Sequence, residues 1–188
     1  AYHYIVKRNS VSVENAQTNK NDSTIKQVVD NWYENNIKGT NDEKYITDNI
    51  FCNDRSICEG DGLPVSTYGT KYCRKKTLIC PQQNDAFTVS DTSNGNGALK
   101  YPIGLISAAE ASLNDYFIGT VGSSDRFWTS TPNEYGGAPA ASGCYVENDE
   151  ITCFFGVNDI KWGVKPVINL KSDMFNNGSG TASDPFRA

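Results

Sequence analysis

Cysteines are the residues of this chain whose type and spacing most clearly imply chemistry. There are six, and they fall into a group of four and a later pair: Cys52, Cys58, Cys73, Cys80, Cys144 and Cys153. An even number of cysteines beside one methionine and one histidine favours a disulfide framework over reactive thiols. Four clustered thiolates could instead hold zinc, but structural zinc sites usually take ligand pairs two to four residues apart, and no Cys-x-x-Cys occurs here.

The later pair predicts a covalently pinned β-hairpin. Cys144 and Cys153 flank the turn sequence Asn148-Asp149, with apolar residues on both sides. A bridge between these two cysteines is the most secure of three expected intramolecular disulfides. Because disulfides persist in oxidising compartments, we expect a secreted or cell-surface protein.

The first four cysteines lie in a stretch, 45–82, that is rich in Gly, Thr, Asn and Asp and has no sustained periodicity. We interpret it as an irregular, disulfide-stapled excursion. A nested pairing of Cys52 with Cys80 and of Cys58 with Cys73 would close a long loop around a shorter one, and other pairings stay open. The outer bridge would contribute roughly 3–4 kcal/mol by the chain-entropy relation.

Side chains suited to acid–base catalysis are few. The one histidine, His3, lies in an expected strand, with no nucleophile and orienting carboxylate placed beside it by the sequence. Glu147, Asp149 and Glu150 cluster at the hairpin and could serve glycoside chemistry, although a solvated turn is the favoured interpretation. We therefore predict that the protein is not an enzyme, with a hydrolase as the weakest alternative.

The chain of 188 residues carries a net charge of -5, and its basic residues are scattered rather than grouped in a stripe. We therefore predict no nucleic-acid partner. Its apolar runs are far shorter than the roughly 20 residues of a membrane helix, so we predict no membrane insertion by this segment. Because it begins at Ala1 without Met, we expect a processed or cloned piece of a longer chain.

Local patterns predict two helices among short strands. Ser23 is the expected N-cap of a helix over about 24–37, whose apolar residues Ile25, Val28, Val29 and Trp32 recur at helical spacing. Ser107 and Glu110 have the spacing of a capping box before a short helix over about 108–115. Strands are expected at 2–6, 86–90, 126–130, 144–147, 150–155 and 164–170, with the first pairing with the last.

Three motifs carry a resemblance to a known family: YPIGLI at 101–106, FWTSTP at 127–132 and GVKPVINL at 163–170. They resemble an uncharacterised family of Gram-positive bacterial surface domains, whose members carry YPIGLIT-DE, YW-LSP and GVRPVINLKSD followed by GSGTASDPY. The resemblance covers most of the chain. Lys165 stands for the usual Arg, Ala109 for Asp and Phe186 for Tyr, and the family has no catalytic residues to carry over.

The resemblance implies a fold. The order strand, helix, helix and then several short strands is similar to the C-type-lectin-like fold, whose bacterial relatives include formylglycine-generating-enzyme-like domains and the variable proteins of diversity-generating retroelements. It implies a single α+β domain over 1–175, followed by a tail or linker at 176–188. In that fold the later hairpins and loops display the binding surface.

Calcium-dependent members of that fold bind their ion through Glu-Pro-Asn and Trp-Asn-Asp motifs. In roughly corresponding places this chain has Pro132-Asn133-Glu134 and Asn158-Asp159, with Thr131 and Val157 where Glu and Trp would stand. Oxygen ligands of this kind suit Ca²⁺. We predict no metal and no cofactor, with calcium as the alternative.

A ligand surface is predicted between 128 and 162. The cysteine-rich excursion is held by disulfides and the terminal strands are needed to form the base of the fold, so this stretch is left as the display surface. Aromatic rings would supply contact area, and amides and carboxylates would supply direction. The expected ligand-binding residues are Trp128, Glu134, Tyr135, Tyr145, Glu147, Asn148, Asp149, Asn158, Asp159 and Trp162. The resulting hypothesis is an extracellular, adhesin-like binding or display domain for an unknown protein or glycan, with a structural stalk or pilus-associated domain as the alternative.

Overall fold

The computed structural model describes residues 19–20, 22–53, 55, 70–71, 78–112, 126–135, 141–147, 150–156, 162–175 and 177–185. Within these ranges the protein is a mixed α+β structure with two α-helices and short antiparallel sheets. The expected strand at 2–6, its pairing with the last strand, and the Cys58–Cys73 bridge all lie outside the described residues. No helix in the described part is both long enough and apolar enough to cross a membrane.

Helix α2, Thr24–Asn36, confirms the first predicted helix. The hydroxyl of its N-cap, Ser23, accepts a hydrogen bond of 3.0 Å from the backbone N–H of Lys26. The helix stops before Gly39, whose φ of 75° is the left-handed conformation that glycine adopts without strain. Its buried face is formed by Ile25, Val29 and Tyr33.

Two apolar residues of α2 that fit the helical spacing do not join that face. Val28 and Trp32 are 49% and 42% exposed. They lie one helical turn apart, next to the buried row, so the apolar stripe in the sequence is wider than the surface that the core covers.

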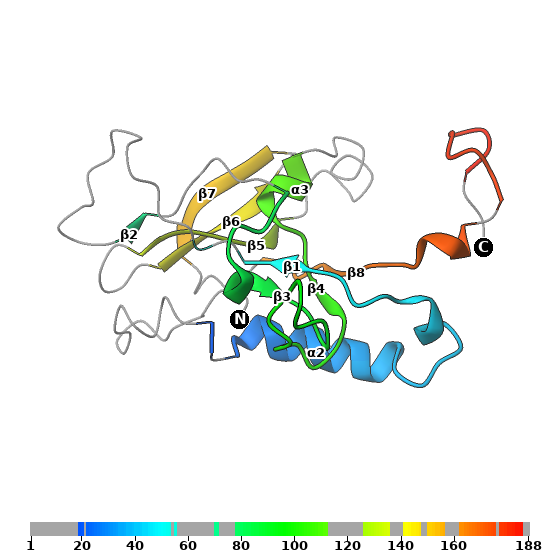
Figure 1. Cartoon of the computed structure of the whole chain (residues 1–188). Helices are drawn as coiled ribbons and strands as arrows, with labels where there is room; N and C mark the ends of the chain where they lie inside the picture. The colour runs from blue at the N-terminus through cyan, green and yellow to red at the C-terminus, as the bar shows by residue number, and fades with distance from the viewer. Residues whose placement is uncertain are drawn as a thin grey trace.

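The largest sheet has four strands in the order β2-β5-β6-β7, all antiparallel (Figure 1). They are β2 (Thr70–Lys71), β5 (Phe127–Tyr135), β6 (Ala141–Glu147) and β7 (Glu150–Gly156). Glu147 lies opposite Glu150, so β6 and β7 form the predicted hairpin. The predicted Cys144–Cys153 disulfide crosses it.

Two smaller antiparallel sheets lie between α2 and the four-stranded sheet in Figure 1. In one, β1 (Phe51–Cys52) pairs with β3 (Ala86–Phe87). In the other, β4 (Ile103–Leu105) pairs with β8 (Pro166–Ile168). The predicted Cys52–Cys80 disulfide joins the end of β1 to the segment before β3.

The second helix, α3 (Ala108–Ser112), begins with the predicted capping box. The Ser107 backbone N–H donates to the Glu110 carboxylate at 2.8 Å, and the Glu110 N–H donates to the Ser107 hydroxyl at 3.2 Å. Two N–H groups of the first turn are thereby satisfied by side chains. Three short 3₁₀ turns complete the elements of the described ranges: η1 (Glu43–Tyr45), η2 (Gln83–Asp85) and η3 (Ser172–Met174).

The core lies on both faces of strands β5 and β6. On one face Trp128, Tyr145 and Trp162 pack in a cluster that extends to α2 and to strands β1, β3 and β4. On the other face Phe127 and Val146 pack against Ala111 of α3. Because neighbouring residues of a strand point to opposite faces, this arrangement buries consecutive side chains of both strands.

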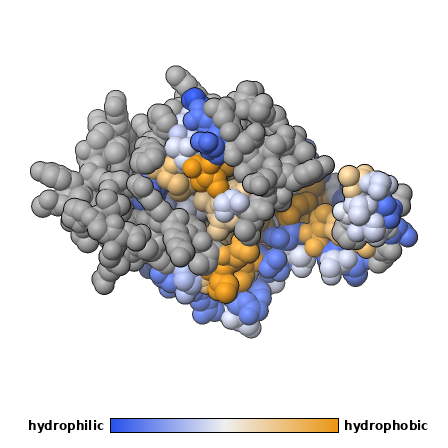
Figure 2. Space-filling view, turned by 90° about the horizontal axis from the view of Figure 1, so that it is seen from above, coloured by the Kyte–Doolittle hydropathy of each residue, from blue (hydrophilic) through white to orange (hydrophobic). Residues whose placement is uncertain are grey.

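The C-terminal segment stands out from the body as a mostly hydrophilic lobe (Figures 1 and 2). Residues 177–183 are exposed. Asp184 closes the segment into a compact turn, since the Ser179 backbone N–H donates to its carboxylate at 3.0 Å and its own N–H donates to the Thr181 hydroxyl at 3.1 Å.

Peptide mapping by mass spectrometry without reduction is expected to recover Cys52–Cys80 and Cys144–Cys153 as linked pairs. Replacing Cys144 and Cys153 together by Ala should lower the free energy of unfolding by about 3 kcal/mol, because the bridge closes a short loop in the unfolded chain. Urea denaturation of the oxidised protein and the double variant measures this difference. Free thiols at these four positions would contradict the framework.

Candidate functional site

Three aromatic residues of the predicted ligand surface lie in the core, and the fourth, Tyr135, has a side chain outside the description. Trp128, Tyr145 and Trp162 are 2%, 0% and 7% exposed. Their rings contact one another, with centroids 4.4 Å apart for the two tryptophans and 3.8 Å apart for Tyr145 and Trp162. The expectation that these rings are displayed is therefore wrong. Its premise was a hairpin with one open face, whereas the structure covers this part of the sheet on both faces.

The other predicted ligand-binding residues are not brought together by the described structure. Glu147 forms an ion pair with Arg126 beside the hairpin. Glu134 and Tyr135 lie at the end of β5, where their backbone pairs with β2, and their side chains lie outside the description. Four further residues also lie outside the described ranges: Asn148, Asp149, Asn158 and Asp159.

Asn133, which belongs to the motif of the calcium alternative, forms hydrogen bonds within the sheet. Asn133 is buried, and its amide donates to the Ser142 hydroxyl at 3.0 Å and to the Cys153 carbonyl. It thus ties β5 to β6 and β7 from within the sheet. Among the residues that the structure describes, no three His, Cys, Asp or Glu side chains are grouped so that they could hold a metal ion.

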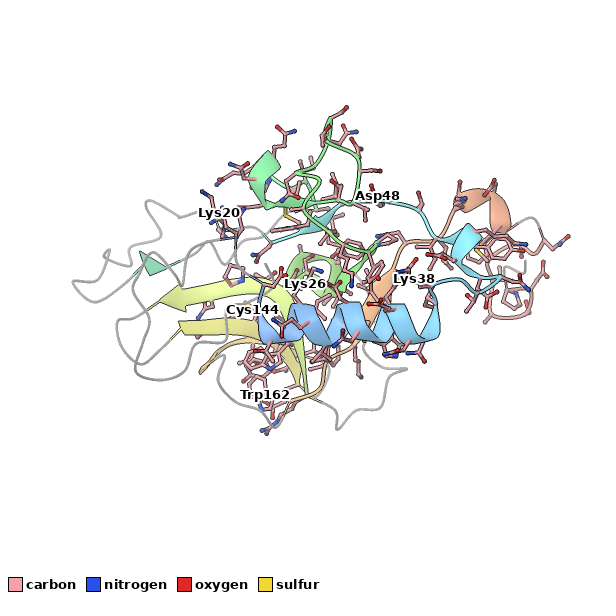
Figure 3. All side chains as sticks on the ribbon, turned by 90° about the horizontal axis from the view of Figure 1, so that it is seen from below. Lys20, Lys26, Lys38, Asp48, Cys144 and Trp162 are labelled. Carbon is pink, nitrogen blue, oxygen red and sulfur yellow. A yellow bond between two sulfur atoms is a disulfide. The ribbon has the colours of Figure 1, made fainter. Side chains whose placement is uncertain are left out.

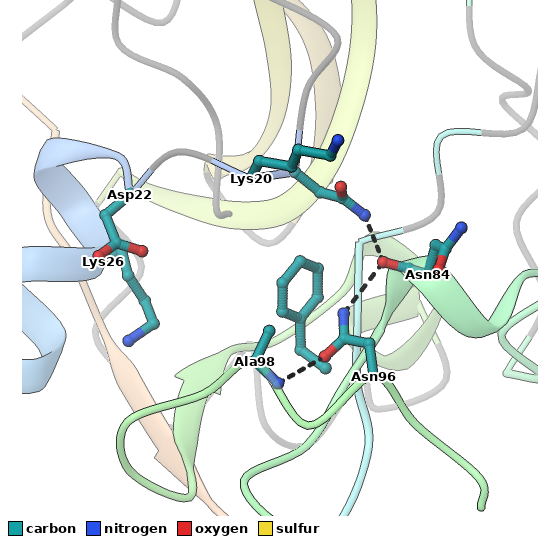
Figure 4. A pocket seen from close by; sticks show the side chains of 8 residues that line it. Lys20, Asp22, Lys26, Asn84, Asn96 and Ala98 are labelled. Atoms are coloured by element: carbon teal, nitrogen blue, oxygen red, sulfur yellow. Dashed lines mark hydrogen bonds between the residues drawn. The ribbon is translucent and has the colours of Figure 1, made fainter. Parts of the chain in front are cut away.

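A pocket of about 360 Å³ lies between the start of α2 and the segment 84–98, called the 84–98 loop below, which includes the short strand β3 (Figure 4). In the close-up Asp22 and Lys26 lie on one side, Asn84 and Asn96 on the other, and Lys20 between them. The pocket is lined by three amide side chains, three charged side chains and two apolar side chains: Asn19, Asn84 and Asn96; Lys20, Asp22 and Lys26; Phe87 and Ala98. A pocket of this size is at the lower end of the range for small-molecule sites, about 300–1,000 Å³.

Hydrogen bonds orient the amides of this pocket. The backbone carbonyl of Asn84 accepts hydrogen bonds from the side-chain amides of both Asn19 and Asn96, and the bond from Asn96 is 3.0 Å long. The backbone N–H of Ala98 donates to the Asn96 side-chain oxygen at 3.0 Å. Asn19 and Asn96 are therefore held in one orientation by backbone groups, as a preorganised binding site requires.

Lys26 brings a buried cation to the pocket wall. The side chain of Lys26, which is labelled in Figure 3, is only 4% exposed. Its ammonium forms an ion pair with Asp30, one turn along α2. The second carboxylate oxygen of Asp30 is buried and has no hydrogen-bond partner within the described residues. Removing one member of such a pair leaves a buried charge unpaired, so the pair holds both side chains in place.

Asp85 fastens the pocket to the disulfide-bonded segment. Its side chain is 0% exposed and accepts from the Arg55 side chain at 2.6 Å and from the Arg55 backbone N–H at 3.1 Å. It also accepts from the Asn19 amide at 3.4 Å. The Asp85 carbonyl accepts at 2.9 Å from Asn53, the residue after Cys52.

Asp48 holds the other side of the same loop (Figure 3). Its carboxylate accepts from the backbone N–H groups of Val89, Ser90 and Asp91, at 2.8, 2.7 and 3.1 Å. Burial by itself raises the pKa of the Asp48 carboxyl, but these bonds and one from the Ser90 hydroxyl outweigh burial and lower the pKa below its ordinary value. The carboxylate is thus a structural clamp on the loop.

The pocket residues were not identified from the sequence. The available signal was composition, since asparagines occur both just before the first helix and in the turn-rich segment 84–96. Polar loops of this composition are common, and nothing local shows that two of them meet.

No protein-family model, no curated protein and no solved structure matches this chain.

Replacing Tyr145 by Ala is expected to lower the free energy of unfolding by about 3–5 kcal/mol, because it leaves a cavity in the aromatic cluster. Replacing the exposed Trp32 by Ala is the matched control and should cost less than about 1 kcal/mol. Urea denaturation under oxidising conditions measures both values. Equal, small losses would contradict the burial of Tyr145.

Replacing Asp48 by Asn should destabilise the protein by about 1–3 kcal/mol at neutral pH, because the amide offers fewer acceptor sites to the three backbone donors. The folded-state pKa of Asp48 is lowered, so its contribution is present above the ordinary carboxyl pKa near 3.9 and is lost as pH falls through the lowered value. The difference between wild type and variant should therefore shrink below about pH 4.

Unfolding midpoints measured from pH 7 to pH 2 test this pH dependence. The exposed Asp173, which lies in η3 outside the clamp, provides the control variant Asp173→Asn. A wild-type advantage over Asp48→Asn that stayed constant through this range would show that the ionised clamp is not its source.

Proposed function

We propose that this chain is a secreted or cell-surface, adhesin-like domain that binds a protein or glycan ligand, and that it is not an enzyme. The observation that carries the proposal is a small pocket with oriented amides, positioned by a disulfide-bonded segment. Recognition by fixed polar groups around an apolar patch is typical of binding sites for small ligands or ligand tips.

The location outside the cell is supported by the disulfides. Cys52–Cys80 and Cys144–Cys153 are consistent with an oxidising, extracellular environment. The resemblance to Gram-positive surface domains points the same way. With a cell-surface location, the pocket would face ligands outside the cell.

We also propose that the fold is C-type-lectin-like. The order of α2, α3, the β6–β7 hairpin and a final short strand supports this. The three motifs of the family resemblance also meet in space: β4 pairs with β8, and the Trp128 backbone N–H donates to the Gly163 carbonyl at 3.1 Å. In a C-type-lectin-like fold these motifs would form the base of the domain, and ligand binding would be left to loops outside them.

A binding role is also supported by what the clamping carboxylates do. Asp48 and Asp85 accept several hydrogen bonds each and hold loops together. The Asp91 carboxylate closes a turn: it accepts hydrogen bonds from the Asn94 side-chain amide and from the backbone N–H groups of Asn94 and Ser93, and these bonds lower the pKa of the Asp91 carboxyl. The Asp48 and Asp91 carboxylates, whose pKa is lowered in this way, serve as structural acceptors rather than as proton donors at neutral pH.

The oxidised domain, immobilised and screened on a glycan array and against purified host surface proteins, is expected to bind a discrete ligand. The same domain after reduction and alkylation is the control, and it should lose binding because the pocket loop is no longer tied at Cys80. Each screen is run with and without Ca²⁺, which tests the calcium alternative.

A result without any ligand, together with end-to-end self-association in sedimentation velocity, would contradict the binding role and favour a structural stalk. Binding that the reduced and alkylated domain kept would show that the disulfide-bonded site is not responsible.

A further inference from the structure

We propose that the pocket between α2 and the 84–98 loop binds an uncharged saccharide, one or two sugar rings of a larger glycan. This inference rests on the proposed binding function and assigns a ligand class to its site. It follows from the hydrogen-bonding groups, the charge balance and the size of the pocket.

The pocket offers donors and acceptors side by side. Within the described residues, the Asn84 side-chain amide and the Asn19 side-chain oxygen have no hydrogen-bond partner, although both residues line the pocket. An amide can both donate and accept, and so can a sugar hydroxyl or acetamido group. The Lys26 ammonium has three donors, of which Asp30 receives one within the described part of the chain.

The charges around the pocket cancel. Lys20 and Lys26 are balanced by Asp22 on the pocket wall and by Asp30, the partner of Lys26. A site for phosphate or a carboxylate would carry surplus positive charge, usually from arginine. The balanced set instead favours a neutral ligand that is rich in hydroxyl groups.

The apolar part of the lining and the volume agree with a sugar. Ala98 is exposed at the pocket and can contact the C–H groups of a sugar ring, whereas Phe87 also lines the pocket but is 3% exposed and belongs to the core cluster. A volume of about 360 Å³ takes one or two rings and is too small for the surface of a folded protein. A glycan that inserts its terminal sugar unit would fit this volume, whereas a folded protein would not.

Titration calorimetry of the oxidised protein with N-acetylglucosamine, its trimer, galactose, glucuronate and inorganic phosphate tests the inference. We expect at least one neutral sugar to bind, and Asn84→Ala to weaken that binding by about tenfold. This change spares the Asn84 carbonyl that orients the neighbouring amides. Asn35→Ala, on the exposed side of α2, is the matched control and should leave binding unchanged.

A second variant tests the cation. Lys26→Met combined with Asp30→Leu removes both buried charges together, so neither is left unpaired. We expect it to weaken sugar binding by about tenfold or more, with thermal unfolding measured to confirm that the variant is folded.

Binding of only glucuronate or phosphate, or no binding by any of the five compounds, would overturn the inference. So would sugar binding that both variants retain. If the array identifies a ligand that both variants still bind, the proposed function stands and only this pocket assignment fails. If neither the array nor calorimetry detects a ligand, both fail.

Discussion

Hydrogen bonds from strand β5 join the two disulfide-bonded parts of the chain. The Ser130 hydroxyl donates to the Cys52 carbonyl at 2.8 Å, and the Thr129 hydroxyl donates to the Cys144 carbonyl at 2.7 Å. These side chains are neighbours in the strand and point to opposite faces, so β5 connects both sides of the sheet. Thr131 adds a bond of 2.9 Å from the first N–H of α3. The buried hydroxyls in the middle of this core strand thus form their hydrogen bonds with backbone groups of other segments, and these bonds hold the segments in place.

The pocket depends on this arrangement. Cys52 is tied to Cys80, and the next residue, Asn53, donates to the Asp85 carbonyl in the segment that leads into the pocket. Asp85 and Asp48 then hold the two sides of the loop that carries the amides. A loop with this many bonds to the rest of the fold would lose little conformational entropy on binding a ligand, as the proposed recognition through polar contacts requires.

Features that depend on a few neighbouring residues were predictable from the sequence. The Ser23 N-cap, the Ser107 capping box and the Cys144–Cys153 hairpin all rest on contacts within ten positions along the chain. Both helices and the strands β3, β5, β6, β7 and β8 were predicted from local residue patterns, although β5 extends to Tyr135, beyond its predicted end, because pairing with β2 and β6 continues it. Strands β1, β2 and β4 were not predicted, because segments of two or three residues show no periodicity.

Only the tertiary structure decided which faces are covered and which loops meet. Alternation along a strand places the Tyr145 side chain on the other face of the sheet from those of its two neighbours. Whether that face is exposed to water or covered by Trp162 depends on a segment 17 positions away. The pocket joins residues more than 60 positions apart, such as Asn19 and Asn84, through a backbone carbonyl that has no side-chain signature. Sequence patterns therefore predicted the helices, the longer strands and the covalent links Cys52–Cys80 and Cys144–Cys153, whereas burial and the site depend on long-range packing that no local pattern encodes.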